Sequence, residues 1–215
     1  MTGDVAEAFK PRLVIADDHR LVVAGLAQLL APYCTIVGTA NDGETLLLEV
    51  ARLQPDVALL DVSMPPNNGL ELVRTIAHRH PAVRTIVVTL HNDPDVAAEA
   101  FRSGASAFVL KDCAASELLE AVRFAVHGQF YVTPLIAGGV IDLLSRAGER
   151  SAVDLTPRQR DVLRLLAEGK SMKEAAVLLD VEPRTVAFHK YRMMRQLNIK
   201  TSAELVRFAV ERKII

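Results

Sequence analysis

Residues 57–66 read Val-Ala-Leu-Leu-Asp-Val-Ser-Met-Pro-Pro, an apolar run that contains one carboxylate and is closed by a proline pair. An apolar run of this length is typical of a parallel strand that is buried on both faces. Asp61 then lies at the carboxyl end of that strand, where open α/β sheets bind their ligands. Taken alone, Asp61 could equally be a turn residue that opens the loop before Pro65, so the rest of the chain has to decide.

The first 128 residues alternate short apolar runs with segments of helical periodicity. Glycine follows the last two helical segments, where it commonly ends a helix. This alternation predicts a five-stranded parallel sheet with helices on both faces, joined by right-handed crossovers. The expected strands are 12–16, 35–40, 56–60, 84–89 and 107–110, and the expected helices are 21–30, 43–52, 69–80, 94–103 and 114–127.

Polar side chains lie at the carboxyl ends of four of these strands. Asp17 and Asp18 follow the first strand, Asp61 the third, Thr89 closes the fourth and Lys111 follows the fifth. The ends of parallel strands meet at one edge of a sheet, so three carboxylates beside an apolar core need a compensating positive charge. Mg²⁺ suits this donor set, because it binds oxygen ligands and needs only one or two carboxylates. A salt-bridge network with Lys111 and no metal is the alternative.

Such an edge can support phosphoryl transfer. A carboxylate beside a divalent cation can attack a phosphoryl group, while the cation and a lysine neutralise charge on the phosphoryl oxygens. The Thr89 hydroxyl could donate to one of these oxygens. The sequence contains neither a Gly-x-x-x-x-Gly-Lys-Ser/Thr loop nor a Gly-x-Gly-x-x-Gly fingerprint, which argues against nucleotide-hydrolysing and dinucleotide-binding enzymes.

The order of two acids, one acid, a hydroxyl and a lysine, with Met64-Pro65-x-x-x-Gly69 and with Phe108 before Lys111, resembles the receiver domain of bacterial response regulators over about residues 11–128. The resemblance implies a flavodoxin-like sheet, Mg²⁺ as cofactor, and no enzymatic activity beyond self-phosphorylation and autodephosphorylation. Implied roles are Asp61 as phosphoacceptor, Lys111 as phosphoryl contact, Thr89 and Phe108 as switch residues, and Asp17 (through water), Asp18, Asp61 and the Ser63 carbonyl as metal ligands.

The two halves of the chain differ in charge. Residues 1–130 carry 10 Lys and Arg against 16 Asp and Glu, whereas residues 150–215 carry 14 against 8. A basic segment of this length suggests a polyanionic partner such as nucleic acid. Between them, residues 129–149 are a linker by composition, with an apolar helix expected at 135–144 that packs on a domain surface or recruits a partner.

Four helices are expected in the second domain, 150–215. Thr156 with Gln159, Ser171 with Glu174 and Thr201 with Glu204 have the spacing of N-terminal capping boxes. Residues 180–182 form a tight connection between the second and third helices, which is the helix-turn-helix arrangement. The expected helices are 157–168, 172–179, 183–197 and 202–212.

The third of these helices presents cations and aromatics beside an inward face of Val186, Met193 and Leu197. Such a surface fits a major groove, where cations meet phosphates and a few side chains contact base edges. An exposed basic helix without a nucleic-acid role is the alternative. The candidate DNA-binding residues are Lys170, Arg184, Thr185, Ala187, Phe188, His189, Lys190, Tyr191, Arg192 and Arg195.

Residues 155–163, Gly169-Lys170-Ser171-x-Lys173-Glu174-x-Ala176 and Thr185-Val186-x-x-His189 resemble the LuxR-type DNA-binding domain. With a receiver in front, the whole chain resembles the NarL/FixJ class of response regulators. The resemblance implies that the third helix of the domain is the recognition helix, that a histidine kinase phosphorylates the receiver, and that the protein binds paired half-sites as a homodimer. Asp180 and Glu182 depart from the turn glycine and the Ser-like cap of that family.

We therefore interpret the chain as a two-component transcription regulator that is switched by phosphorylation of Asp61. A phosphorylation-independent DNA-binding regulator, or a small phosphotransferase or phosphatase, are the alternatives. No apolar run is long enough for a membrane span and no signal-peptide pattern opens the chain. Cys34 and Cys113 lack metal-ligand spacing, which fits a reducing compartment. Both observations favour the cytoplasm and no membrane partner.

Overall fold

The computed structural model describes residues 10–64, 69–113, 115–145 and 155–211. Its contacts divide the chain into two units, Met1–Asn92 with Ala97–Ala137, and Asp93–Val96 with Gly138–Ile215. Residues 65–68, which follow Met64, and residues 146–149 of the expected linker lie outside the described residues. Among those described, no helix combines the length and the apolar character that crossing a membrane requires.

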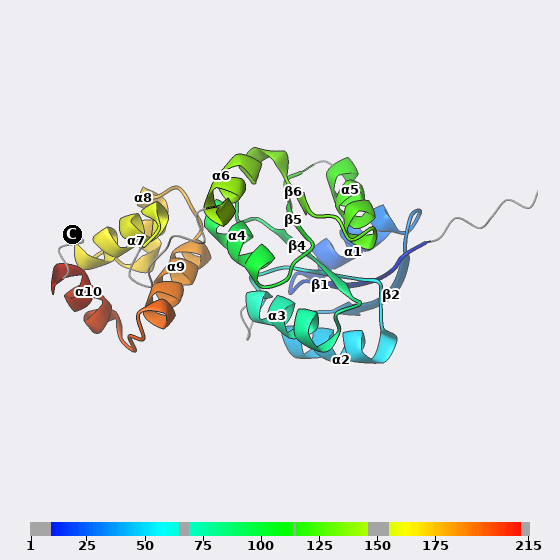
Figure 1. Ribbon diagram of the computed structural model, residues 1–215, viewed down its shortest axis with the longest axis horizontal. Coiled ribbons are helices and arrows are strands. Elements are labelled where there is room, and N and C mark those ends of the chain that lie inside the picture. Colours follow the sequence, from blue (N-terminus) through cyan, green and yellow to red (C-terminus); the bar gives the residue numbers. More distant parts are fainter. Residues whose placement is uncertain (1–9, 65–68, 114, 146–154, 212–215) are drawn as a thin grey trace, which may run out of the picture. The chain divides into compact units, whose positions relative to one another are not determined.

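The first unit is built on one parallel sheet, as the alternation of the sequence predicts (Figure 1). Its strand order is β2-β1-β3-β4-β5-β6, and every pair of neighbours is parallel. The first five strands follow the flavodoxin-like order, which confirms the fold class. They are β1 (Arg12–Ala16), β2 (Thr35–Ala40), β3 (Val57–Leu60), β4 (Arg84–Thr89) and β5 (Ala107–Leu110).

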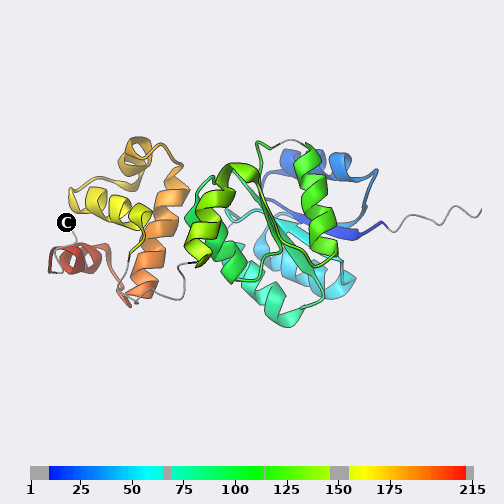
Figure 2. The same cartoon turned by 45° about the horizontal axis from the view of Figure 1, so that its top comes forward.

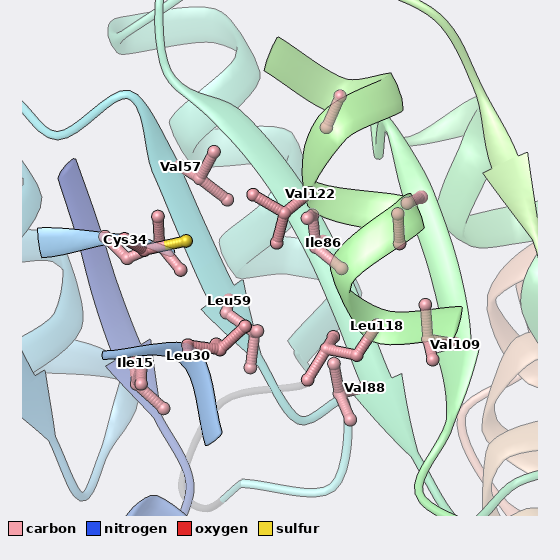
Figure 3. Close-up of a cluster of buried hydrophobic side chains, with 14 residues drawn as sticks. Ile15, Leu30, Cys34, Val57, Leu59, Ile86, Val88, Val109, Leu118 and Val122 are labelled. Carbon is pink, nitrogen blue, oxygen red and sulfur yellow. The ribbon is translucent and has the colours of Figure 1, made fainter. Parts of the chain in front are cut away.

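Helices follow the strands in turn, and their observed ends differ from the expected ends by only one residue. Helices α1 and α5 pack on one face of the sheet through Leu30, Leu118 and Val122 (Figure 3). Helices α2 and α3 contact each other and lie on the other face (Figure 1). The helices are α1 (Arg20–Leu30), α2 (Gly43–Leu53), α3 (Gly69–Arg79), α4 (Pro94–Arg102) and α5 (Ala115–Val126).

Both faces of the central strands are buried, which explains why these strands have no polar alternation. Leu59 of β3 belongs to the cluster under α1 and α5, while its neighbours Ala58 and Leu60 point to the opposite face and are also buried. Successive side chains of a strand point to opposite faces, so a strand covered on both sides needs an unbroken apolar run. The apolar run that opens residues 57–66 is therefore a consequence of helices on two sides.

The sheet has a sixth strand that the sequence did not predict. Strand β6 (Tyr131–Val132) pairs in parallel with β5 and extends the sheet edge. Thr133 continues this pairing, since its hydroxyl accepts a hydrogen bond from the Leu110 amide at 3.1 Å. A strand of two residues is too short to show a hydrophobic periodicity, and it forms only because the edge of β5 is there to pair with it. The described part of segment 129–149 contains β6 and α6 (Pro134–Ser145). Helix α6 confirms the helix expected at 135–144, with one more residue at each end.

The second unit contains the four helices expected from the capping pattern (Figure 2). The capping boxes of Thr156 with Gln159 and of Ser171 with Glu174 are both complete, so each box satisfies two backbone amide donors. Val162, Leu163, Val186, Met193 and Leu205 form a shared core. The helices are α7 (Pro157–Ala167), α8 (Met172–Leu178), α9 (Pro183–Gln196) and α10 (Ser202–Glu211).

The connection between α8 and α9 is the predicted tight turn. Asp180 adopts a positive φ of 51°, the conformation for which a glycine is preferred. The Val181 amide donates to the Ala176 carbonyl at 3.0 Å, and the Arg158 guanidinium donates to the Leu179 carbonyl at 2.9 Å. Glu182 begins α9 without a side-chain cap. The first bond closes the end of α8, and the second joins the start of the turn to α7.

Candidate functional site

The strand order brings the predicted acids to one edge of the sheet. Strands β1 and β3 are neighbours, so Asp17 and Asp61, which follow them, lie side by side; the Asp61 amide donates to the Ala16 carbonyl at 3.1 Å. Asp17 is 1% exposed and Asp61 is 4% exposed. Two nearly buried carboxylates at adjacent strand ends repel each other unless a positive charge lies between them.

Lys111 supplies such a charge. Its Nζ donates to Asp17 Oδ2 at 2.5 Å and to Asp61 Oδ2 at 2.9 Å, bridging the two carboxylates from the end of β5. Burial disfavours the charge on Lys111, but the hydrogen bonds and charges of Asp17 and Asp61 outweigh it and raise the pKa of the ammonium. The structure therefore confirms that these side chains gather, and it holds Lys111 protonated between them.

Asp18 completes the group that we name the acidic site (Asp17, Asp18, Asp61 and Lys111). Its Oδ1 lies 2.9 Å from Nδ1 of His19, and the His19 amide donates to Asp17 Oδ1 at 2.9 Å. One ligand atom from each of Asp17, Asp18 and His19 lies within 4.8 Å of the others. Three carboxylates against one ammonium leave a negative excess, and carboxylate oxygens are the donors that Mg²⁺ prefers. The residues present therefore fit a magnesium ion.

The other predicted receiver residues are Ser63, Thr89 and Phe108. The Ser63 amide donates to Asp61 Oδ1 at 3.1 Å. Thr89 is fully buried at the end of β4, and its hydroxyl accepts from the His91 amide at 3.2 Å. Phe108 is also fully buried. A switch in which the Phe108 ring moves inward requires the ring to begin at the surface, but in this structure the ring is already in the interior.

Sequence reasoning missed two histidines at this edge. His19 contacts both acids that follow β1, and His91 Nε2 lies 3.1 Å from Ser63 Oγ. His91 lies two residues beyond Thr89, just as Ser63 lies two residues beyond Asp61, and this equal spacing from two predicted site residues was the available signal in the sequence.

Helix α9 presents most of the predicted DNA-binding residues at its surface. Arg184, Tyr191 and Arg195 are exposed, as is Lys170 in the α7–α8 connection. Thr185 and His189 are buried, contrary to the expectation that Thr185 points outward. Thr185 and His189 are four residues apart and flank the line of Val186 and Met193, so the buried stripe of α9 is wider than predicted. Ala187, Phe188, Lys190 and Arg192 are partly exposed.

Two cation–aromatic pairs lie on the surface of α9. Lys190 Nζ lies 5.4 Å from the ring centroid of Tyr191, and Arg192 Cζ lies 5.9 Å from that of Phe188. Each pair places a positive charge over an aromatic face within the range of a cation–π interaction. The helix therefore offers both positive charge and flat apolar surface.

Two family models match the chain. Residues 13–123 match the response regulator receiver domain, and residues 153–209 match the luxR family of bacterial regulatory proteins. The first match covers strands β1 to β5, apart from Arg12, and the acidic site, and the second covers α7 to α9 and most of α10.

Similar proteins share the whole arrangement of domains. The oxygen regulatory protein NreC of Staphylococcus carnosus is 32% identical over 95% of this chain and 99% of its own length. The transcriptional regulatory protein MctR of Rhizobium johnstonii is 29% identical over 98% of both chains. Among solved structures, the RcsB response regulator of Salmonella typhimurium has a TM-score of 0.58 at 26% identity, covering 94% of this chain and 98% of that one.

A structure of an RcsB–DNA complex matches with a TM-score of 0.60 at 26% identity, over 94% of this chain and 98% of that one. The family models, the relatives and the observed fold agree on a receiver domain followed by a LuxR-type helix-turn-helix domain. The chain belongs to the two-component response regulators that join a receiver domain to a LuxR-type DNA-binding domain, and it is a transcription regulator of that family.

Proposed function

We propose that Asp61 accepts a phosphoryl group from a partner histidine kinase and that this modification controls DNA binding by α9. The observation that carries the proposal is the Lys111 bridge, with Nζ at 2.5 Å from Asp17 and 2.9 Å from Asp61. A buried ammonium within reach of a carboxylate nucleophile is already located where charge develops on a transferred phosphoryl group.

In the proposed reaction, an Asp61 carboxylate oxygen forms a bond to phosphorus while the bond from phosphorus to its donor breaks. Lys111 exchanges its contact with Asp61 for a contact with a phosphoryl oxygen, and the Thr89 hydroxyl donates to another. Asp17 (through water), Asp18, Asp61 and the Ser63 carbonyl would hold Mg²⁺, which supplies charge neutralisation for the phosphoryl oxygens. We do not include a Phe108 movement, because that ring is already buried.

The proposed output is binding of a homodimer to paired half-sites. Exposed and partly exposed side chains of α9 would contact the groove, while Lys170 would contact a phosphate. Thr185 and His189 are buried and are left out of the base contacts. One solved relative is described as two RcsB dimers bound to DNA, which supports both the partner and the symmetry. Because the DNA partner lies in the bacterial cytoplasm, we propose that the protein works there.

The test combines labelling, assembly and DNA binding. We would incubate the full chain with Mg²⁺ and a radiolabelled small phosphodonor, and then measure sedimentation and binding to sequences selected from a random DNA pool. Wild type should incorporate label, dimerise and bind DNA more tightly, whereas Asp61→Asn should do none of these. Glu120→Gln removes an exposed acid of α5 and serves as the matched control.

Two results would change the assignment. Label that persists in Asp61→Asn would show that another residue is the acceptor. Equal DNA binding and assembly with and without label would leave a DNA-binding regulator that does not depend on phosphorylation, which is the alternative considered for the sequence.

A further inference from the structure

We propose that a pocket between α1 and α5 binds a small, neutral, apolar molecule, and that the bound molecule holds Lys111 in its bridge and so slows phosphorylation of Asp61. The effect on phosphorylation rests on the proposed function, whereas the binding site does not. Lys111 is the residue that the pocket shares with the acidic site.

The pocket has a volume of about 320 Å³. Strands β4 and β5 and helices α1 and α5 supply its lining, and Figure 3 shows the part of this lining that the sheet and α5 contribute. Small-molecule sites in proteins begin at about 300 Å³ and are lined mainly by apolar side chains. The apolar side chains of this lining include Val22, Leu26, Leu29, Val88, Val109 and Leu118.

A glycine on α1 leaves room in the pocket. Gly25 belongs to the lining, and a Cβ added to it would meet no atom within 4 Å. Glycine in the interior of a helix is less favourable than alanine, so this position lacks a side chain at a cost in stability. Val22, Leu26 and Leu29 on the same helix are only partly buried. An apolar molecule in the pocket would therefore remove further apolar surface from water.

The charges around the pocket favour a neutral molecule. Among the described residues of the lining, Lys111 alone is charged, and its Nζ already bridges Asp17 and Asp61. An ionised ligand would leave water without gaining an opposite charge, which costs free energy. An anion would in addition lie beside the negative excess of the acidic site. The chemistry therefore points to an uncharged molecule about as large as a bicyclic aromatic ring system.

Lys111 connects the pocket with the proposed reaction. Phosphoryl transfer to Asp61 requires Lys111 to exchange its contact with this carboxylate for a contact with a phosphoryl oxygen. A molecule that packs against Lys111 in the bridged arrangement favours that arrangement over the others. By linkage, the molecule should oppose the transfer, and phosphorylation should weaken the binding of the molecule in return.

Cys113 provides a direct reading of occupancy. It lines the pocket and is partly buried, whereas Cys34 is only 4% exposed. The experiment follows the modification of Cys113 in the full chain by a maleimide, using mass spectrometry, at increasing concentrations of indole. Indole-3-carboxylate has the same ring system and a negative charge, so it tests the expected neutrality of the ligand.

We expect indole to bind with a dissociation constant of about 1 mM, as suits a ligand of few atoms. At about ten times that concentration, modification of Cys113 should be about tenfold slower, because only the unoccupied fraction reacts. Indole-3-carboxylate at the same concentration should leave the rate unchanged.

Two variants fill the pocket from opposite helices. Gly25→Leu adds a side chain on α1 and Ala115→Leu enlarges one on α5, and both residues belong to the lining. Gln28→Leu, at an exposed position of α1 outside the lining, is the matched control. Both filled variants should lose the protection by indole, and Gln28→Leu should keep it. Gly25→Leu should not lower the unfolding temperature, because leucine is favoured over glycine in a helix.

The second measurement is the initial rate at which Asp61 takes label from the small phosphodonor, with and without saturating indole. Indole should slow labelling of wild type and of Gln28→Leu about fivefold, a typical coupling between two sites. Labelling of Gly25→Leu should not respond to indole.

The outcomes separate this inference from the proposed function. Equal modification of Cys113 with and without indole overturns the binding site, and so does protection that survives in both filled variants. Protection with an unchanged labelling rate overturns the effect through Lys111. A wild type that takes no label even without indole overturns the proposed function, while the Cys113 result still decides whether the site exists.

Discussion

The two domains place their functional side chains in opposite ways. In the receiver, Asp17 and Asp61 are almost fully buried and are held by hydrogen bonds from Lys111. In the DNA-binding domain, Arg184, Tyr191 and Arg195 lie on the surface of one helix. A small phosphoryl group needs a few charges fixed at short distance, whereas a DNA groove needs a broad charged surface.

This difference predicts different responses to substitution. Removing one charge from the buried group should disturb the domain itself, because the remaining charges lose their partner in a low-dielectric setting. Removing one charge from the exposed helix should leave the fold intact and change only binding. Lys111→Met in the buried group and Arg195→Ala on the exposed helix test this contrast directly.

Lys111→Met should destabilise the receiver by about 3 kcal/mol, because Asp17 and Asp61 are then buried without their cation. Added Mg²⁺ should recover part of the loss, since it supplies positive charge to the same carboxylates. Lys10→Met removes an exposed lysine from the same domain and is the control. Chemical denaturation with and without Mg²⁺ measures both effects, and equal stability of the two variants would contradict the buried bridge.

Arg195→Ala should weaken DNA binding with little effect on folding. If Arg195 contacts one phosphate, the slope of log affinity against log salt should become shallower by about 0.9. Arg160→Ala removes an exposed cation of α7, outside α9, and should keep the wild-type slope. Titrations at several salt concentrations provide the slopes; identical slopes for both variants would remove Arg195 from the proposed contacts.

Asp180→Gly should stabilise the DNA-binding domain by about 1 kcal/mol, because Asp180 has a φ of 51° that costs a residue with a side chain more than it costs glycine. The matched control is Glu168→Gly, at a helix end with a φ of −72°, where glycine gains nothing. Thermal unfolding of both variants measures whether Asp180→Gly alone gains stability. A destabilised Asp180→Gly would mean that the aspartate makes a contact that outweighs its backbone strain.

The smallest predicted effect concerns Tyr131 of β6. Burial and the neighbouring Glu117 raise the pKa of the Tyr131 phenol to about 12. The neutral phenol is favoured in the folded state, so its contribution to stability is complete below pH 10 and is lost as the pH rises through about 12. Ultraviolet titration should show one of the three tyrosines ionising late, and Tyr131→Phe should remove that step. If the late step persists in Tyr131→Phe, the shift belongs to another tyrosine.

Much of the receiver site could be predicted because it depends on strand ends. Asp17, Asp61 and Lys111 each follow an apolar run, and the carboxyl ends of parallel strands must meet at one edge. A salt-bridge network of these acids with Lys111 was one of the two expectations, but the sequence did not show which two acids Lys111 bridges. Its geometry depends on which strands are neighbours, and the order β2-β1-β3-β4-β5-β6 is a property of the folded sheet.

Helix α9 was predictable as an element, but its exposed surface was less predictable. Capping residues and apolar spacing located α7 to α10 to within a residue or two. The buried stripe of α9 proved wider than the line of Val186 and Met193, because Thr185 and His189 are also buried. Periodicity gives the direction of a helix face but does not give its width, which neighbouring elements decide.

By itself, the sequence determined the alternation of strands and helices, the two domains and the residue types at each strand end, because these follow from local periodicity and capping. Only the tertiary structure decided the added strand β6, the bridge from Lys111 to Asp17 and Asp61, and the contact of His91 with Ser63. Each of these joins segments that are distant in the chain, and such contacts form only once the sheet has brought their backbones within hydrogen-bond distance.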